Sequence, residues 1–357
     1  MTSYFNLLKG DAIQQLRTLA PNSVHAVITD PPYGLTSDHD INEILSFWLS
    51  GEAYVNPKSG YNGTGWDNSV PGPELWQEVE RVLMPGGFVL AFGASRTSHL
   101  TAIALELAGF DIRDSIHWVY ASGCQRSKDL SNYPELDGSI ALQYSVKGMR
   151  TTLKPGHEPI TVARKRMYEG QDLLGSMLDY KLGAINHNGF LDKTKAVASN
   201  VLVVHDLDCT ENTCLCGIAT DASQQHSTPI YPHHEIPNAS LNFPKPKKSE
   251  RPKSADGTSH ETVKPIALMQ TLIRAFSAPG QIILDPFLGS GTTAEAALVE
   301  GRNIIGCEIT PKYWPLILGR FASLEMRRFD VRLGSPFTLQ STSVLTEDEC
   351  ALSTLQA

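Results

Sequence analysis

Four consecutive residues, Asp30-Pro31-Pro32-Tyr33, could together bind and orient an amino group on a planar ring. The carboxylate can accept one N–H of the amine. A proline-fixed turn can point a backbone carbonyl at the same nitrogen to accept the other N–H. The aromatic ring can stack on a planar base. Two acceptors would favour a more tetrahedral nitrogen with its lone pair aimed outward, which suits nucleophilic attack. The alternative is an ordinary Asp-Pro turn with a packed tyrosine.

A second run, Leu284 to Thr293, has the composition of a ligand-binding turn between a strand and a helix. Gly289 and Gly291 let the backbone approach a ligand closely, and a helix that begins after them offers free N–H groups. No Gly-Lys-Ser/Thr follows, so the run is not a P-loop. Glu308 ends the next predicted strand, 17 residues after Gly291, and an acidic residue about that far on typically binds ribose hydroxyls. The alternative for Glu308 is a surface carboxylate.

The elements that must position these residues alternate between strands and helices in two blocks. The first block has predicted strands at 24–29, 88–92 and 111–120 and predicted helices at 74–84 and 97–108. The second has predicted helices at 263–276, 292–300 and 311–326 and predicted strands at 281–284 and 303–309. This alternation predicts an α/β doubly wound sheet. Asp30 follows a strand directly, where ligands bind in such sheets.

Two other regions lack regular signals. Residues 34–72 are rich in Gly, Ser and Asn and predict a long loop. The middle segment predicts an insert on one edge of the sheet. We therefore expect four parts: a catalytic half at 1–125, an inserted region at 126–254, a second half at 255–330 and a loose tail at 331–357.

Composition excludes several classes of protein. The chain has 357 residues, 41% of them hydrophobic, which is enough for a core. No run of 18 apolar residues exists, so we expect no membrane span. The first residues lack the basic start and apolar stretch of a secretory signal. Six cysteines are too few for a disulfide scaffold. We expect a cytoplasmic protein.

Charge is distributed unevenly along the chain. The formal net charge is −8, which alone points away from a nucleic-acid partner, but residues 126–254 hold 16 Lys/Arg against 14 Asp/Glu. Contacts to phosphates need only local positive charge. A solvated surface is the alternative. Two basic clusters lie in this region: Lys147, Arg150, Lys154, Arg164, Lys165 and Arg166, and Lys245, Lys247, Lys248, Arg251 and Lys253.

Together, these motifs resemble the amino-methyltransferases that use S-adenosylmethionine (SAM), in particular those that modify DNA. Residues 30–33 resemble their catalytic motif, and residues 285–291 resemble their cofactor loop. The catalytic motif comes first, as in the β-class permutation. The resemblance spans roughly 4–125 and 258–322. It implies a circularly permuted, mostly parallel, seven-stranded Rossmann-like sheet with an inserted target-recognition region.

The resemblance also implies a set of site residues. His260-Glu261-Thr262-Val263-Lys264-Pro265 resembles the His-x-Thr-x-Lys-Pro element, in which Thr262 and Lys264 would hold the methionine carboxylate of the cofactor. Asp11 would reach the adenine of the cofactor, and Trp66-Asp67 also resembles the class. Catalytic residues would be Asp30, Pro31, Pro32 and Tyr33, and the implied cofactor-binding set is Asp11, Asp30, Thr262, Lys264, Asp285, Phe287, Gly289, Ser290, Gly291, Thr292 and Glu308.

The middle segment is similar to phage-type and prophage-type members of this family. Lys154 to Ile160 resembles a Lys-Pro-x-x-Glu-Pro segment found in many of them. Gly123-Cys124-Gln125-Arg126-Ser127 departs from the Gly-Phe-Pro-Lys-Ser that those relatives more often carry. The family holds the flipped base with this region, so the departure affects the base pocket.

The implied reaction is direct methyl transfer to a flipped nucleotide, without a covalent enzyme intermediate. Alignment and preorganised acceptors would supply most of the rate. Asp30 would orient the amine; acting instead as a general base would require a raised pKa. In this family, a motif that begins with Asp favours the N6 of adenine, and one that begins with Ser favours the N4 of cytosine.

A metal site is the competing interpretation of the middle segment. His205, Cys209, Cys214 and Cys216 lie close in sequence, and such side chains can bind Zn²⁺. Their spacing is not that of a standard zinc finger. We therefore expect no metal, and a structural zinc is the alternative.

The leading hypothesis is a SAM-dependent DNA adenine-N6 methyltransferase that acts on double-stranded DNA, as a monomer or homodimer, free-standing or paired with a separate restriction endonuclease. The alternatives are methylation of cytosine N4, of RNA or of a protein amide, and an inactive SAM- or DNA-binding module. The presence of Asp30, Tyr33, Gly289 and Glu308 argues against the inactive module.

Overall fold

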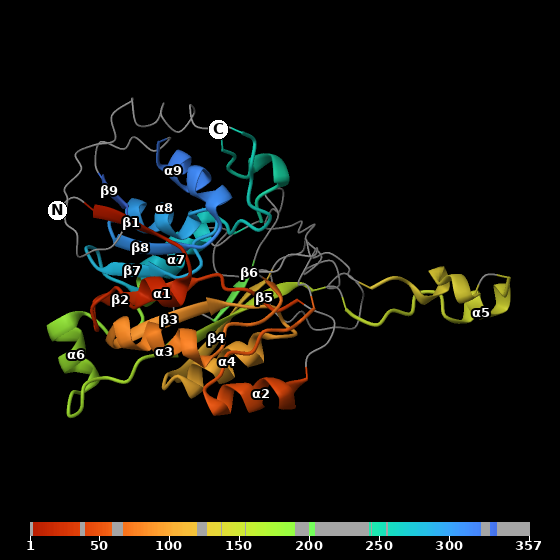
Figure 1. Cartoon of the computed structure of the whole chain (residues 1–357), viewed down its shortest axis with the longest axis horizontal. Helices are drawn as coiled ribbons and strands as arrows, with labels where there is room; N and C mark the ends of the chain where they lie inside the picture. The colour runs from red at the N-terminus through yellow and green to blue at the C-terminus, as the bar shows by residue number, and fades with distance from the viewer. Residues whose placement is uncertain are drawn as a thin grey trace, which may run out of the picture.

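A central sheet with helices on both faces organises the chain (Figure 1). The computed structural model describes residues 3–35, 40–58, 67–119, 127–136, 138–153, 155–189, 200–203, 243, 245–254, 256–322 and 329–333. The strands are β1 (Ser3–Lys9), β2 (Val24–Thr29), β3 (Leu83–Phe92), β4 (Asp111–Val119), β5 (His157–Arg164), β6 (Val201–Val203), β7 (Ile282–Asp285), β8 (Asn303–Glu308) and β9 (Phe329–Leu333). The helices are α1 (Ala12–Leu16), α2 (Ile41–Ser50), α3 (Pro73–Val82), α4 (Ser98–Leu107), α5 (Ile140–Ser145), α6 (Leu173–Tyr180), α7 (Ile266–Phe276), α8 (Thr292–Val299) and α9 (Trp314–Ala322).

The sheet is mixed and mostly parallel. Its strand order is β6-β4-β5-β3-β2-β7-β8-β1-β9. Among the described strands, β5 alone runs opposite to the others, since it pairs antiparallel with both β3 and β4. The family resemblance implies seven strands, and the short strands β6 and β9 extend those seven at the two edges of the sheet. The predicted doubly wound α/β architecture is therefore present, with a wider sheet than expected.

Both faces of the sheet are covered, which explains why the central strands are apolar throughout. Along β2, Ala26 and Ile28 pack into the core under α7, α8 and α9. Val24 and Val27 pack into the core under α1, α3 and α4. Each of these four side chains is fully buried. β2 is therefore buried on both faces at the centre of the sheet, and Asp30 directly follows its C-terminal end.

Three sequence expectations need correction. The expected loop at 34–72 contains α2, a helix capped by Asp40 that buries Ile44 and Trp48. The helix predicted at 74–84 ends at Val82, and the strand predicted at 88–92 begins earlier, because β3 starts at Leu83 directly after α3. The expected edge insert contributes β5, which lies inside the sheet between β3 and β4. The last correction matters most because β5 carries a residue of the site.

Residues 127–153 form an arm that carries α5 and extends away from the sheet (Figure 1). Hydrogen bonds close the arm on itself, for example from the Leu130 N–H to the Met149 carbonyl (2.9 Å). Large apolar side chains on it are exposed, among them Ile140 and Tyr144. In the described part of the chain, no helix is both long and apolar enough to cross a membrane.

Candidate functional site

Four neighbouring parallel strands bring carboxylates to one edge of the sheet. β2, β7, β8 and β1 are adjacent and parallel, so their C-terminal ends meet there. Asp30 follows β2, Asp285 ends β7, Glu308 ends β8 and Asp11 lies two residues beyond β1. Ligands bind at this edge in open α/β sheets. The structure therefore places predicted residues from both halves of the sequence on the expected edge.

The turn at Asp30–Tyr33 is held by buried polar contacts. The Asp67 carboxylate is 3% exposed and accepts the backbone N–H groups of Tyr33 (2.7 Å) and Gly34 (3.1 Å). The Thr97 hydroxyl donates to the Tyr33 carbonyl at 2.6 Å. Asp67, which sequence resemblance singled out, therefore fixes the position of the Tyr33 backbone. Its neighbour Trp66 lies outside the described residues.

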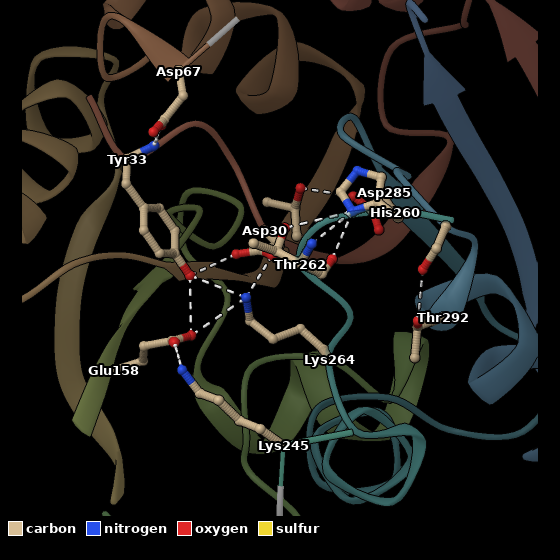
Figure 2. A network of polar contacts seen from close by, with 12 residues as sticks. Asp30, Tyr33, Asp67, Glu158, Lys245, His260, Thr262, Lys264, Asp285 and Thr292 are labelled. Carbon is tan, nitrogen blue, oxygen red and sulfur yellow. Dashed lines mark hydrogen bonds and ion pairs between the residues drawn. The ribbon is translucent and has the colours of Figure 1, made fainter. Parts of the chain in front are cut away.

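The Asp30 carboxylate binds two side chains, one on each oxygen (Figure 2). Oδ1 accepts the Tyr33 hydroxyl at 2.6 Å, and Oδ2 accepts the Lys264 ammonium at 2.5 Å. The Lys264 ammonium also donates to the Tyr33 hydroxyl at 3.1 Å. The predicted catalytic pair thus meets a lysine from the second half of the chain.

Glu158, on β5, joins the same network (Figure 2). Its Oε2 lies 3.2 Å from the Tyr33 hydroxyl and 3.3 Å from Lys264 Nζ. Its Oε1 accepts the Lys245 ammonium at 2.5 Å. Lys245 Nζ also lies 5.3 Å from the centroid of the Trp118 ring. Two carboxylates and one ammonium group therefore contact the Tyr33 hydroxyl, and a second ammonium group binds the far oxygen of Glu158.

The pKa shifts show which charges this network favours. Burial alone would raise the pKa of Glu158, but Lys264 and Lys245 lower it to about 2. Burial opposes the charge on Lys264, but Asp30 and Glu158 together raise its pKa above the usual value. Burial, Asp30 and Glu158 raise the pKa of Tyr33 well above its ordinary range. At neutral pH, Glu158 and Lys264 are charged and the Tyr33 hydroxyl keeps its proton.

The glycine loop at 289–291 lies close to the His260 ring and to Glu308. Gly289 has φ +55°, and a Cβ there would lie 3.2 Å from His260 Nε2. Gly291, with φ +81°, precedes α8. The Gly289 N–H donates to Glu308 Oε2 at 2.8 Å, and the Thr310 N–H donates to Oε1 at 2.7 Å. Burial raises the pKa of Glu308, which is 6% exposed.

The remaining predicted cofactor residues lie around this loop. Asp285 is 1% exposed and accepts the Thr29 hydroxyl (2.7 Å) and the Phe287 N–H (3.1 Å), and burial raises its pKa to about 6. Ser290 and Thr292 bond each other through their hydroxyls at 3.2 Å. Asp11 caps α1 by accepting the Gln14 N–H.

Residues 260–265 contact two different parts of the site. The His260 ring packs on Tyr313, with ring centroids 4.5 Å apart, and its Nδ1 lies 2.7 Å from the Thr262 carbonyl oxygen. The Thr262 side chain is exposed. The Lys264 ammonium lies on the Asp30 side of the site. The predicted role of Thr262 and Lys264 in holding the cofactor carboxylate stays a prediction.

Sequence reasoning missed Glu158 and Lys245. Glu158 lies within the Lys-Pro-x-x-Glu-Pro segment, where the sequence analysis predicts no strand, so the sequence does not indicate which way its side chain points. Lys245 belongs to a basic cluster that the sequence predicts to be either a phosphate-contacting face or a solvated surface. The candidate zinc residues His205, Cys209, Cys214 and Cys216 lie outside the described residues, and so does Lys154.

The Asp-Pro-Pro-Tyr turn and the glycine loop thus lie at the same edge of an α/β sheet. Residues 24–318 match the N6_N4_Mtase family, described as DNA methylase. The chain therefore belongs to the N6/N4 DNA methylase family.

Individual proteins of known name are also similar to the chain. The Type II methyltransferase M.HindIII of Haemophilus influenzae is 29% identical over 322 residues, which is 85% of this chain and 90% of that protein. The DNA adenine methyltransferase YhdJ of Escherichia coli is 25% identical over 91% of this chain and 82% of YhdJ. The PvuII DNA methyltransferase (cytosine-N4-specific) is 15% identical and covers 90% of this chain and 87% of its own, with a TM-score of 0.50. This last likeness concerns the fold alone.

Proposed function

We propose that this DNA methylase transfers the methyl group of SAM to the N6 amine of a flipped adenine in double-stranded DNA. The observation that carries the proposal is the pairing of Asp30 and Tyr33 at the end of β2, two strands from Glu308 at the end of β8. An amine-orienting carboxylate and a stacking ring thus lie on the same edge as a candidate ribose-binding carboxylate.

The residues at this edge fit SAM. Gly289 and Gly291 keep the backbone of the loop open to a ligand. Glu308 accepts two backbone N–H groups and a side-chain hydrogen bond from Thr310. A carboxylate has about four acceptor sites, so Glu308 retains acceptor capacity for a ribose hydroxyl. The carboxylates of Asp30 and Asp285 suit a positively charged sulfonium. When bound, SAM supplies an electrophilic methyl group, and the chain's residues align the nucleophile with it.

Asp30 and Tyr33 would then act on the target base. Flipping a nucleotide out of the duplex costs a few kcal/mol. Stacking on the Tyr33 ring would offset about 1–3 kcal/mol of that cost. Asp30 accepts an N–H of the amine and directs the nitrogen lone pair outward. As the new N–C bond formed, the bond between the methyl group and the sulfonium sulfur would break and leave its electron pair on the sulfur. The Asp30 carboxylate would stabilise the positive charge that develops on the nitrogen, and the nitrogen would then lose its proton to solvent water.

Two observations support adenine over cytosine. The catalytic tetrapeptide begins with Asp30, as in family members that methylate the N6 of adenine. YhdJ, which aligns with most of the chain, is named an adenine methyltransferase. Cytosine N4 is the second candidate, because the family model that matches the chain, N6_N4_Mtase, covers both N6 and N4 methylation.

DNA contacts outside the pocket are proposed for residues 126–254, as the target-recognition region. The projecting arm at 127–153 leads through 155–156 into β5, which carries Glu158 of the site. Lys147 and Arg150 lie on this arm. The arm could therefore reach phosphates beside a target base held at Asp30.

The test is transfer of tritium from labelled SAM to mixed-sequence duplex DNA, followed by nucleoside analysis by mass spectrometry, with Asp30→Ala as the control. The proposal expects label in N6-methyladenine, absent with the variant. Label in N4-methylcytosine would overturn the base assignment. No transfer to DNA would overturn the proposed substrate.

A further inference from the structure

Each oxygen of the Asp30 carboxylate already accepts one short hydrogen bond. Oδ1 accepts the Tyr33 hydroxyl at 2.6 Å and Oδ2 accepts the Lys264 ammonium at 2.5 Å. A carboxylate oxygen has a second lone pair, so a target amine that donates to Asp30 either shares an oxygen with one of these donors or takes its place. Lys264 is 9% exposed and Tyr33 is partly buried, so a displaced donor needs another acceptor nearby.

Glu158 Oε2 is such an acceptor. It lies 3.2 Å from the Tyr33 hydroxyl and 3.3 Å from Lys264 Nζ, so both donors already reach it. Its other oxygen is held by Lys245 at 2.5 Å (Figure 2). The Lys245 contact therefore fixes the orientation of the Glu158 carboxylate and keeps Oε2 directed at the two donors.

We propose that Glu158, held by Lys245, is a positioning residue that receives the Tyr33 hydroxyl and the Lys264 ammonium when the target amine takes their place on Asp30. The inference rests on the proposed catalytic role of Asp30 and Tyr33. A lysine that passes from one carboxylate to another stays paired throughout. Without Glu158, its release from Asp30 would leave a buried ammonium without a counter-charge, which is strongly unfavourable. Glu158 thus makes Asp30 available to substrate.

The competing explanation is static charge balance, in which Glu158 only offsets the two lysines. The two explanations predict different methylation rates for a variant that removes both charges of the Glu158–Lys245 pair. Replacement of a buried ion pair by apolar residues of similar size is often neutral for stability. Glu158→Met/Lys245→Met leaves Asp30 and Lys264 as a balanced pair, but it removes the alternative acceptor.

Four proteins are compared: the wild type, Lys245→Met, the double variant Glu158→Met/Lys245→Met, and Asp30→Ala. Each is measured for its midpoint of unfolding in denaturant, its Kd for SAM, and its single-turnover rate with saturating mixed-sequence duplex DNA. Lys245→Met retains the Glu158 acceptor and serves as the matched partner of the double variant.

The exchange mechanism expects the double variant to unfold near the wild-type midpoint and to bind SAM within about threefold, while its methylation rate falls roughly tenfold or more, because the reacting groups are misaligned. Lys245→Met should lose less rate than the double variant. A wild-type rate in the double variant, with Asp30→Ala inactive, would overturn this inference alone. A wild-type rate in Asp30→Ala would overturn the proposed catalytic site, and this inference with it.

Discussion

The Lys264 ammonium lies 2.5 Å from the Asp30 carboxylate, although 234 residues separate them in the sequence. Asp30 follows β2 in the first half of the chain, and Lys264 lies two residues before α7 in the second. Glu158 of β5 contacts Lys264 at 3.3 Å. One buried ion-pair network therefore joins the predicted catalytic motif, the element upstream of the glycine loop and the middle segment. A change in any one of the three parts should affect the others.

Loss of the Asp67 carboxylate should slow methylation. Its Oδ1 accepts the backbone N–H groups of Tyr33 and Gly34, so Asp67→Ala frees the turn that carries the Tyr33 ring. We expect the single-turnover rate to fall about tenfold to a hundredfold, since small misplacements of reacting groups have effects of that size. Affinity for SAM should change little.

The matched control is Asp40→Ala. Asp40 also accepts two backbone N–H groups, those of Asn42 and Glu43, but it caps α2 on the exposed surface. Asp40→Ala should lower the free energy of unfolding by about 1 kcal/mol, as expected for loss of a helix cap. Its methylation rate should not change. Equal rates for Asp67→Ala and Asp40→Ala would rule out a role for Asp67 in placing Tyr33.

The N- and C-terminal parts of the site could be predicted because each signal is local. Asp30 and Glu308 end apolar strands, and Gly289 lies in a strand-to-helix turn, so sequence alone indicates their edge of the sheet. Glu158 and Lys245 could not be predicted in the same way. Their positions depend on β5 entering the sheet antiparallel between β3 and β4, a pairing that no local pattern encodes.

The α2 helix could have been predicted. Within the Gly-, Ser- and Asn-rich stretch, Ile44 and Trp48 are four residues apart and both are buried. Asp40 is a good helix cap before them, and Gly51 ends the helix with φ +79°. The overall composition of residues 34–72 predicts a loop, although ten of these residues have a helical pattern.

Removal of the Glu308 carboxylate should weaken binding of SAM. Glu308 also accepts the Gly289 N–H at 2.8 Å, so Glu308→Ala removes both a candidate ribose partner and the contact that holds the glycine loop. A hydrogen bond to a charged group contributes about 1.5–3 kcal/mol, which corresponds to roughly a tenfold to hundredfold loss of affinity. Isothermal titration calorimetry without DNA measures this directly.

Glu261→Ala provides the comparison for Glu308→Ala. Glu261 is an exposed carboxylate beside Thr262. Glu261→Ala should bind SAM with the same affinity as the wild type. An unchanged affinity in Glu308→Ala would show that the end of β8 does not hold the cofactor.

Asp285 should make stability depend on pH. Burial raises its pKa from 3.8 to about 6. A raised carboxyl pKa contributes stability that is fully present below pH 3.8 and is lost as pH rises through 6. The shift corresponds to at most about 3 kcal/mol. Asp285→Asn keeps an acceptor for the Thr29 hydroxyl but does not titrate. The variant should therefore not show this loss of stability as the pH rises.

The measurement is the free energy of unfolding in urea at pH 5 and pH 7.5, for the wild type and Asp285→Asn. Glu158 titrates below this window, because its pKa is lowered to about 2. All other titratable groups are common to both proteins, so their contributions cancel in the difference. The free energy of unfolding of Asp285→Asn, minus that of the wild type, should be larger at pH 7.5 than at pH 5. A difference that does not change with pH would exclude the titration of Asp285 in this range.

Asp30 is proposed to orient the amine that is methylated. The most direct test of this role is the single-turnover rate of methyl transfer to duplex DNA by the wild type and Asp30→Ala, with SAM affinity measured on the same preparations. We expect Asp30→Ala to bind SAM within about tenfold of the wild type and to transfer the methyl group roughly a hundredfold to a thousandfold more slowly, as for loss of a preorganised electrostatic partner. Methyl transfer by Asp30→Ala at the wild-type rate would rule out this role of Asp30.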